Sequence, residues 1–257
     1  MGLFNLSRFN LVSGDVSPTN QPVLFGEKAI GDAVPRSNVL AVRIGAPKIE
    51  TTAITPGISS GLMFSRNRHS SRTIEIEIEL PLERETYPEN MRKARAWAIS
   101  SEPQKLVLSA YKGRYIYATC TGLNEFDQKE WWEPVVVTFE CWDPYFVSAN
   151  PSSAAVGASF TIEGDKAPDA QIIYNLASGE SLVNPQWTFD GGKYIKLNTT
   201  VTGGEIKIDL KTQCVSRNDV SLMQYLVLGS RFPELEPGTH IITGPSGGTI
   251  SWHERWL

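Results

Sequence analysis

Residues 134–145 read PVVVTFECWDPY, an apolar run that ends in an abrupt turn. The run from Val135 to Phe139 is rich in β-branched side chains and is typical of a buried strand. Pro144 cannot donate a backbone hydrogen bond and restricts the residue before it, so we expect the strand to end at Trp142. This strand is the element from which the two halves of the chain can be interpreted.

The two sides of this strand differ in pattern. Residues 148–155 are mostly small and have little to bury, which indicates a domain boundary. Before the boundary the chain carries one clear helical pattern, and after it strands and turns alternate almost throughout. We therefore predict two domains, a first at residues 1–145 and a second at residues 146–257.

Composition limits the classes of protein that are compatible with the sequence. The chain has 257 residues, is 41% hydrophobic and has a formal net charge of −4, which argues against a general binder of nucleic acid or anionic membranes. No apolar run approaches the roughly 20 residues of a membrane span, and the start lacks the apolar core of a signal peptide. Cys120, Cys141 and Cys214 show no C-x-x-C spacing, which is typical of a reducing compartment. We expect folding in the cytoplasm without membrane insertion.

The cleanest alternation in the sequence lies at residues 72–80. Apolar and acidic side chains occupy successive positions there, with Ile74, Ile76, Ile78 and Leu80 on one face and Glu75, Glu77 and Glu79 on the other. This period of two predicts a half-buried strand. The three neighbouring carboxylates require either cations on the adjacent strand or full exposure to solvent.

The rest of the first half predicts an α+β domain. Thr86 and Glu89 have capping-box spacing, and the apolar residues that follow predict a helix over residues 87–99. Strands are expected at residues 39–49, 105–110 and 114–120, and a loop at residues 51–61. Residues 1–38 are expected to form short strands or an extended arm. Mainly antiparallel sheet with one covering helix follows from this order.

The second half predicts a β-sandwich or jelly roll. Short strands are expected at residues 159–163, 170–175, 186–189, 193–197, 205–210, 240–243 and 249–256. Turns are expected at Ser178-Gly179, Asp190-Gly191-Gly192, Thr202-Gly203-Gly204 and Ser246-Gly247-Gly248. Regular short strands separated by turns favour the sandwich classes. Residues 222–228 fit either a short helix or a strand.

No pattern in the sequence indicates a catalytic, metal or cofactor site. His69, His240 and His253 lie in three separate segments, without the paired spacing of a zinc site. There is no phosphate-binding glycine loop and no nucleophile elbow. A hydrolase is consequently the weakest of the functional classes.

Two clusters allow more than one interpretation. Arg66, Arg68, His69 and Arg72 fit either a phosphate grip or a solvated hairpin loop. Trp187, Trp252 and Trp256, with Trp131 and Trp132, fit either an aromatic surface that stacks on sugar rings or core packing. Alternation makes Trp252 a core candidate.

In this order the motifs resemble the distal tail proteins of long-tailed bacteriophages that infect Gram-positive bacteria. The likeness covers the chain from about residue 40 onward. It is carried by the alternating strand at residues 72–80, the helix at residues 87–100, the aromatic strand at residues 115–118, the signature VTFECWDPY at residues 137–145, and the stretches at residues 172–179, 204–209 and 232–238.

This resemblance implies a structural protein. It implies a first domain that assembles into a hexameric ring at the distal end of the tail tube, and a second, galectin-like sandwich. It also implies three partners: the major tail protein above, a tail-associated fibre or lysin protein below, and DNA that only passes through the ring. Galectins bind sugar through a His-x-Asn-Pro-Arg stretch and a Trp-Gly pair followed by Glu. Neither occurs here.

Two functional hypotheses follow. The first is a non-catalytic ring adaptor at the virion tail tip, in which Glu75, Glu77 and Glu79 could line the lumen and repel DNA phosphates; the alternative for these residues is a solvated face balanced by Lys and Arg. The second is a carbohydrate-binding module for host wall polysaccharide that uses Trp187 or Trp252.

Overall fold

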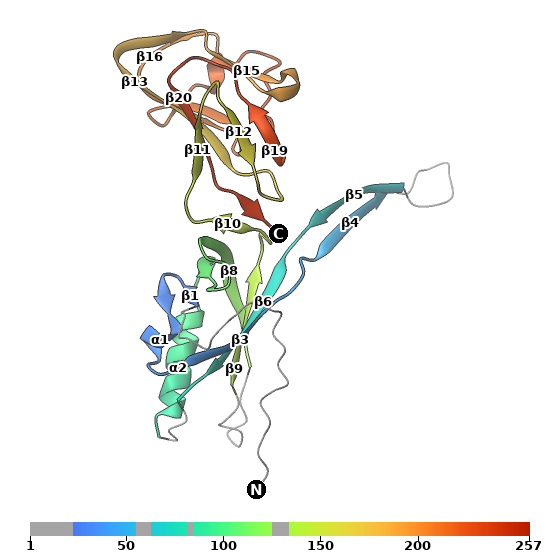
Figure 1. Ribbon diagram of the computed structural model, residues 1–257, viewed down its shortest axis with the longest axis vertical. Coiled ribbons are helices and arrows are strands. Elements are labelled where there is room, and N and C mark those ends of the chain that lie inside the picture. The colour runs from blue at the N-terminus through green and yellow to red at the C-terminus, as the bar shows by residue number, and fades with distance from the viewer. Residues whose placement is uncertain (1–22, 55–62, 82–84, 125–133) are drawn as a thin grey trace. The chain divides into compact units, whose positions relative to one another are not determined.

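The computed structural model describes residues 23–54, 63–81, 85–124 and 134–257 (Figure 1). The chain is mainly β, with few helices and several antiparallel sheets, as predicted. It forms two compact units, and neither is continuous in sequence. Unit 1 comprises Met1–Ala46, Thr73–Ser109 and Ala118–Glu140; unit 2 comprises Pro47–Arg72, Ala110–Tyr117 and Cys141–Leu257. The division into continuous domains at residues 1–145 and 146–257 stays a prediction. No helix in the described segments is long and apolar enough to cross a membrane.

Unit 1 is built on one sheet with the strand order β2-β1-β7-β8-β9-β6-β3. Its strands are β1 (Leu24–Phe25), β2 (Lys28–Ala29), β3 (Asn38–Ile44), β6 (Arg72–Glu79), β7 (Gln104–Val107), β8 (Arg114–Leu123) and β9 (Val135–Cys141). The strand predicted around residues 135–142 is β9, and it ends before Trp142 as expected. In β6 and β9 alternate side chains are buried, which confirms the period of two that predicted both strands.

Two helices cover one face of this sheet. They are α1 (Ile30–Ala33) and α2 (Tyr87–Ala98), which contact each other. Phe139 of β9 packs against Phe25 at 4.8 Å and Trp97 at 6.2 Å between ring centroids. The odd-numbered side chains of β9 therefore face the helices. The predicted capping box does not form, because no side chain caps the start of α2 and Glu89 instead pairs with Arg92 at 2.7 Å.

The first four residues of the loop predicted at residues 51–61 belong to a strand. β4 (Ile49–Ile54) pairs with β5 (Met63–His69) in a two-stranded sheet of its own (Figure 1). Thr51 and Thr52 are β-branched, and the strand ladder satisfies their backbone groups. The loop prediction was wrong for residues 51–54. Residues 55–62 lie outside the described residues.

Unit 2 contains a six-stranded antiparallel sheet with the order β11-β20-β13-β16-β17-β18. These strands are β11 (Ser152–Ala155), β13 (Ala170–Val183), β16 (Thr200–Asp209), β17 (Cys214–Arg217), β18 (Val220–Ser221) and β20 (Gly248–Trp252). The other elements are β10 (Phe146–Ser148), β12 (Ser159–Ile162), β14 (Gln186–Thr188), β15 (Tyr194–Lys196), β19 (Gly238–Ile241), β21 (Arg255–Trp256), and the 3₁₀ turns η1 (Asp190–Gly192) and η2 (Met223–Tyr225). β12 pairs with β19, β14 with β15, and β10 with both β21 and the start of β8.

Two predicted turns are bends within long strands. Ser178-Gly179 lies inside β13, whose register shifts between Leu176 and Ser181, and Gly179 has a φ of 90°. Thr202-Gly203-Gly204 lies inside β16. A glycine at positive φ lets a strand bulge without ending its pairing. The glycines therefore do bend the backbone, but the chain does not reverse its direction there.

The small-residue run after the first half also forms a strand. Residues 152–155 are β11, which pairs with β20 at the edge of the sheet. Backbone hydrogen bonds form this edge strand without large side chains, and the domain boundary predicted at this run stays a prediction. The undecided stretch at residues 222–228 contains the 3₁₀ turn η2 and an isolated bridge from Leu226 to Leu197.

Candidate functional site

The predicted acidic strand places its carboxylates on the open face of unit 1. Thr73 of β6 donates to Glu140 of β9 at 3.2 Å, so the odd-numbered side chains of β6 lie on the face opposite the helices. Arg43 of β3 pairs with Glu77 at 2.9 Å and approaches Glu75 at 3.8 Å. Asn38 donates to Glu79 at 3.1 Å. Within the described residues, one guanidinium and one amide thus serve three carboxylates, so this part of the face carries an excess of negative charge.

A groove lies on the helix side of unit 1. It has a volume of about 700 Å³ and lies between α1, α2, β1 and the start of β7. Phe25, Ala33, Ala96, Trp97 and Ile99 supply its apolar lining. Trp97 donates its indole N–H to the Lys28 carbonyl at 2.9 Å, which fixes the groove floor. Ile99, immediately after α2, keeps 65% of its surface exposed.

Charged side chains complete the groove. Its lining includes Lys28, Arg92 and Lys93 against the single carboxylate of Asp32. Asp32 accepts from the Ala29 backbone N–H at 3.1 Å. The rim is therefore basic, and sequence analysis missed it because its residues come from segments about 60 positions apart.

The three predicted aromatic residues do not form a shared surface. Trp187 is fully buried and donates to the Tyr174 hydroxyl at 2.9 Å. Trp252 is 4% exposed and donates to the Glu254 carboxylate at 2.6 Å. Trp256 is partly exposed, with the Arg114 guanidinium 3.6 Å from its ring centroid. Trp187 and Trp252 belong to the core of unit 2, so sugar rings could not stack on them in this structure. Trp131 and Trp132 lie outside the described residues.

The basic cluster around residue 68 is dispersed along strands. Arg68 pairs with Glu50 at 2.7 Å across the β4–β5 ladder, and His69 meets the Tyr145 hydroxyl at 2.9 Å. Arg72 is 5% exposed and lies 5.5 Å from the Phe146 ring centroid, and its burial lowers its pKa. Arg68, His69 and Arg72 do not converge on a common point, so these three do not assemble a phosphate grip; the side chain of Arg66 lies outside what the structure describes.

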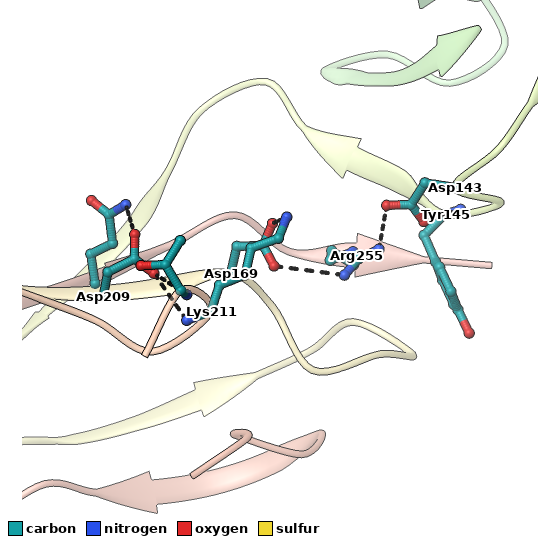
Figure 2. A network of polar contacts seen from close by, with 8 residues as sticks. Asp143, Tyr145, Asp169, Asp209, Lys211 and Arg255 are labelled. Atoms are coloured by element: carbon teal, nitrogen blue, oxygen red, sulfur yellow. Dashed lines mark hydrogen bonds and ion pairs between the residues drawn. The ribbon is translucent and has the colours of Figure 1, made fainter. Parts of the chain in front are cut away.

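The signature Trp142-Asp143-Pro144-Tyr145 anchors the C-terminal strand of unit 2. Arg255 of β21 binds Asp143 at 2.5 Å and lies 3.8 Å from Asp169 (Figure 2). The Tyr145 ring centroid is 5.1 Å from the same guanidinium. Asp169 also binds Lys211 at 2.5 Å. Sequence analysis singled out the signature but missed Arg255, which is more than 100 positions away.

A buried carboxylate closes unit 2 beside this network. Glu254 is 6% exposed and accepts from three donors: the Glu163 backbone N–H at 3.1 Å, the Gly164 N–H at 2.8 Å and the Trp252 indole. A carboxylate is rarely buried unless such donors replace its hydration. Its role is to hold the loop after β12 against β20.

The arrangement offers surfaces rather than a reaction centre. Within the described residues no group of three His, Cys, Asp or Glu side chains converges as metal ligands would. Cys120, Cys141 and Cys214 are free thiols, and burial raises the pKa of Cys120. The most developed features outside the cores are the acidic face and the basic groove of unit 1.

Comparisons with known proteins identify what these units resemble. Residues 183–256 match a family described as the C-terminal domain of siphovirus-type tail components. A search of curated proteins finds no match.

Solved structures extend the likeness to nearly the whole chain. The Dit protein of phage SPP1, described as a paradigm of the hub adsorption apparatus in phages that infect Gram-positive bacteria, is 17% identical with a TM-score of 0.74. The alignment covers 92% of this chain and 99% of that one. Chains of the phage P2 baseplate in its activated conformation, with Ca and with Sr, are 10% and 11% identical; both have TM-scores of 0.42 and cover 83% of this chain and 90% of theirs.

The family match and the shared fold confirm the resemblance that the sequence motifs predicted. Residues 183–256 match the C-terminal domain family of siphovirus-type tail components, and the chain has the fold of SPP1 Dit.

Proposed function

We propose that this chain forms a hexameric ring at the tail tip and acts as the hub of the adsorption apparatus. The observation that carries the proposal is the likeness to SPP1 Dit over 92% of this chain and 99% of that one. That protein is described as a paradigm of the hub adsorption apparatus, and the alignment spans both chains almost completely.

Features of the chain support assembly into a larger structure. The β4–β5 hairpin is a two-stranded sheet of its own among the described strands. Isolated two-stranded hairpins are marginally stable in water, so a neighbouring surface would stabilise this one. The major tail protein on one side of the ring and a fibre or lysin protein on the other are the partners we propose.

DNA would pass through the centre of this ring without specific binding. Glu75, Glu77 and Glu79 remain candidates for the lumen, since carboxylates repel phosphates. Arg43 offsets part of their charge within one chain. A cryo-EM map of the ring would test this role: carboxylates on the outer wall or within an interface would exclude it.

For unit 2 we propose a galectin-like sandwich. A six-stranded sheet, two further strand pairs and a core that includes Trp187, Tyr174 and Trp252 support this assignment. Because Trp187 and Trp252 are buried, no observation favours the carbohydrate-binding module. An experimental structure whose strand order departs from that of galectins would contradict the assignment.

The experiment that tests the ring is the native mass of the full chain. Light scattering behind gel filtration should give a mass of six chains, or of two stacked rings, and negative-stain images should show a central opening. A chain that remains monomeric at every concentration would contradict the proposal. Reconstitution with the purified major tail protein should then place the ring at one end of the tube.

A further inference from the structure

Among the described strands, the sheet of unit 1 ends in two edges with different chemistry. β2 forms one edge and β3 the other. The basic groove lies beside β2, and the acidic face of β6 lies beside β3. A ring built from one kind of subunit needs two unlike surfaces that complement each other, because its contacts run head to tail.

The groove is suited to receive an apolar side chain. Ala33 and Ala96 leave room between the two helices, and Phe25 and Trp97 provide a rigid apolar floor. Ile99 is 65% exposed at the end of α2 although apolar side chains surround it in the lining. Its exposure is costly in water and is relieved if another chain covers it.

The β3 edge presents such an apolar side chain. Leu40 is 47% exposed. It lies where the β3–β6 register shifts between Val39 and Ala41, so it is the extra residue of a bulge at the sheet edge. Bulges re-aim side chains, and this one leaves a leucine without cover at the border of the acidic face.

Charge complements shape at the two edges. The groove lining carries Lys28, Arg92 and Lys93 against Asp32. Arg92 is already paired with Glu89, which leaves Lys28 and Lys93 as the cations available to a partner. On the other edge, Arg43 is the one cation paired with Glu75 and Glu77 among the described residues, and Glu79 accepts from the neutral amide of Asn38. Each edge therefore has an excess of one sign, and the excesses are opposite.

The two surfaces lie on opposite faces of the sheet. The groove is on the helix face, where Trp97 contacts Phe139. The carboxylates are on the other face, with Thr73 and Glu140. Two such surfaces can meet when the edge of one subunit's sheet lies over the opposite edge of its neighbour's sheet. Repetition of this overlap from subunit to subunit can close a ring.

We propose that the acidic β3–β6 edge of one copy docks over the basic groove of the next, with Leu40 entering the groove and Glu75 and Glu79 meeting Lys28 and Lys93. This interface rests on the proposed ring function and assigns its surfaces. It also gives the carboxylates a role that differs from lining the lumen. In the lumen, reversal of their charge would leave the ring intact; at this interface, reversal breaks it.

The test uses two charge-reversed full-length variants. The acidic-edge variant is Glu75→Lys with Glu79→Lys, and the groove variant is Lys28→Glu with Lys93→Glu. Each should elute at the mass of a single chain where the wild type elutes as a ring. Mixed in equal amounts, they should recover the ring mass, because each faulty surface then meets a partner of opposite charge. The alternating ring closes for any even number of chains, and a hexamer satisfies this condition.

Controls separate the interface from general charge effects and from misfolding. Glu205→Lys with Lys193→Glu reverses exposed charges in unit 2 and should leave the ring mass unchanged. Ala96→Arg fills the groove from an exposed helical position that tolerates arginine, and should also reduce the mass to one chain. Circular dichroism at low temperature should match the wild type in every variant, and every variant should still unfold cooperatively on heating; the monomeric variants should melt at a lower temperature than the ring because assembly stabilises the fold.

The outcomes distinguish the interface from the ring itself. Variant rings that persist, or a mixture of folded variants that stays monomeric, would overturn the interface alone. A wild-type chain that never forms a ring would overturn the proposed function and the interface with it. High salt should weaken the wild-type ring, because screening acts on the opposed charges.

Discussion

The two units differ in the group that accepts a hydrogen bond from the indole N–H of each buried tryptophan. In unit 1, Trp97 lies at the edge of an aromatic cluster and donates to a backbone carbonyl, that of Lys28. In unit 2, Trp187 donates to the Tyr174 hydroxyl, which in turn donates to the Pro245 carbonyl at 2.8 Å. Trp252 donates to the carboxylate of Glu254. In unit 1 the indole thus bonds to the backbone, whereas in unit 2 the two indoles bond to the buried side chains of Tyr174 and Glu254.

The difference has an energetic consequence. An apolar core loses stability through cavities, at a cost that depends on the volume removed. A core with buried polar groups loses stability when one member of a hydrogen-bonded set is removed and the others remain unpaired. The two units should consequently differ in the kind of substitution that damages them most.

Removing a ring from the aromatic cluster of unit 1 should have the largest effect. Phe139 is fully buried against Phe25 and Trp97, and Phe139→Ala should lower the free energy of unfolding of unit 1 by about 4 kcal/mol. Amide hydrogen exchange of peptides from β6 would measure the loss locally.

Thr138→Ala on the opposite face is the matched control, with an expected loss below about 1 kcal/mol. Equal losses for the two variants would contradict a cavity mechanism. A larger change of exchange in β13 than in β6 would show that the units do not unfold separately.

The polar core of unit 2 should be sensitive to an almost isosteric change. In Glu254→Gln an amide NH₂ replaces one acceptor oxygen, so the indole of Trp252 or the backbone donors of the loop lose their partner. We expect a loss of about 3 kcal/mol in the unfolding free energy of unit 2. Exchange of peptides from β13 and β20 would report it.

Glu163→Gln provides the control, because that carboxylate is exposed one residue before Gly164. Its effect should stay within about 0.5 kcal/mol. If Glu254→Gln were equally mild, the buried carboxylate would contribute little and the contrast between the units would fail.

A smaller effect is expected from the relay between Trp187 and Pro245. Tyr174→Phe keeps the ring but removes the hydroxyl, which leaves one indole N–H and one carbonyl unpaired. The expected loss is about 1.5 kcal/mol in urea unfolding of unit 2. Tyr225→Phe, at an exposed position, should cause almost none. A stabilising Tyr174→Phe would mean that the relay is strained.

The contrast also explains how much the sequence could predict. The alternation of Ile and Glu in β6 predicts both that the segment is a strand and which face is buried, because neighbouring residues in a strand point to opposite faces. The helix α2 and the end of β9 were predictable for the same reason. Local pattern is sufficient where one face is apolar and the other is charged.

Long-range partners decided the features that the sequence did not predict. Gly179 and Gly204 carry the turn signal, yet neighbouring strands continue to pair around them and turn the signal into bulges. Residues 152–155 form a strand because β20 lies beside them. Glu254 and Arg255 have ordinary local surroundings, and their importance comes from Glu163, Asp143 and Asp169 in distant segments. The basic groove likewise joins residues from segments that no local motif connects.

The raised pKa of Tyr115 should have the smallest effect on stability near neutral pH, and it should be visible as phenolate absorbance at alkaline pH. Burial first, then the neighbouring Tyr117 and Asp169, raises the pKa of Tyr115 to about 12. The unfolded value is about 10, so the preference of the fold for the neutral phenol is complete below pH 10 and disappears as the pH rises from 10 through 12. Phenolate absorbance should show a late step that Tyr115→Phe reduces, while the urea midpoint at pH 7 changes little. Burial also raises the pKa of Tyr145 and of Tyr174, so part of the late absorbance should persist in Tyr115→Phe and decrease further when Tyr174→Phe is added. Ionisation of all tyrosines near pH 10 would mean that water reaches these phenols, which is incompatible with a closed polar core in unit 2.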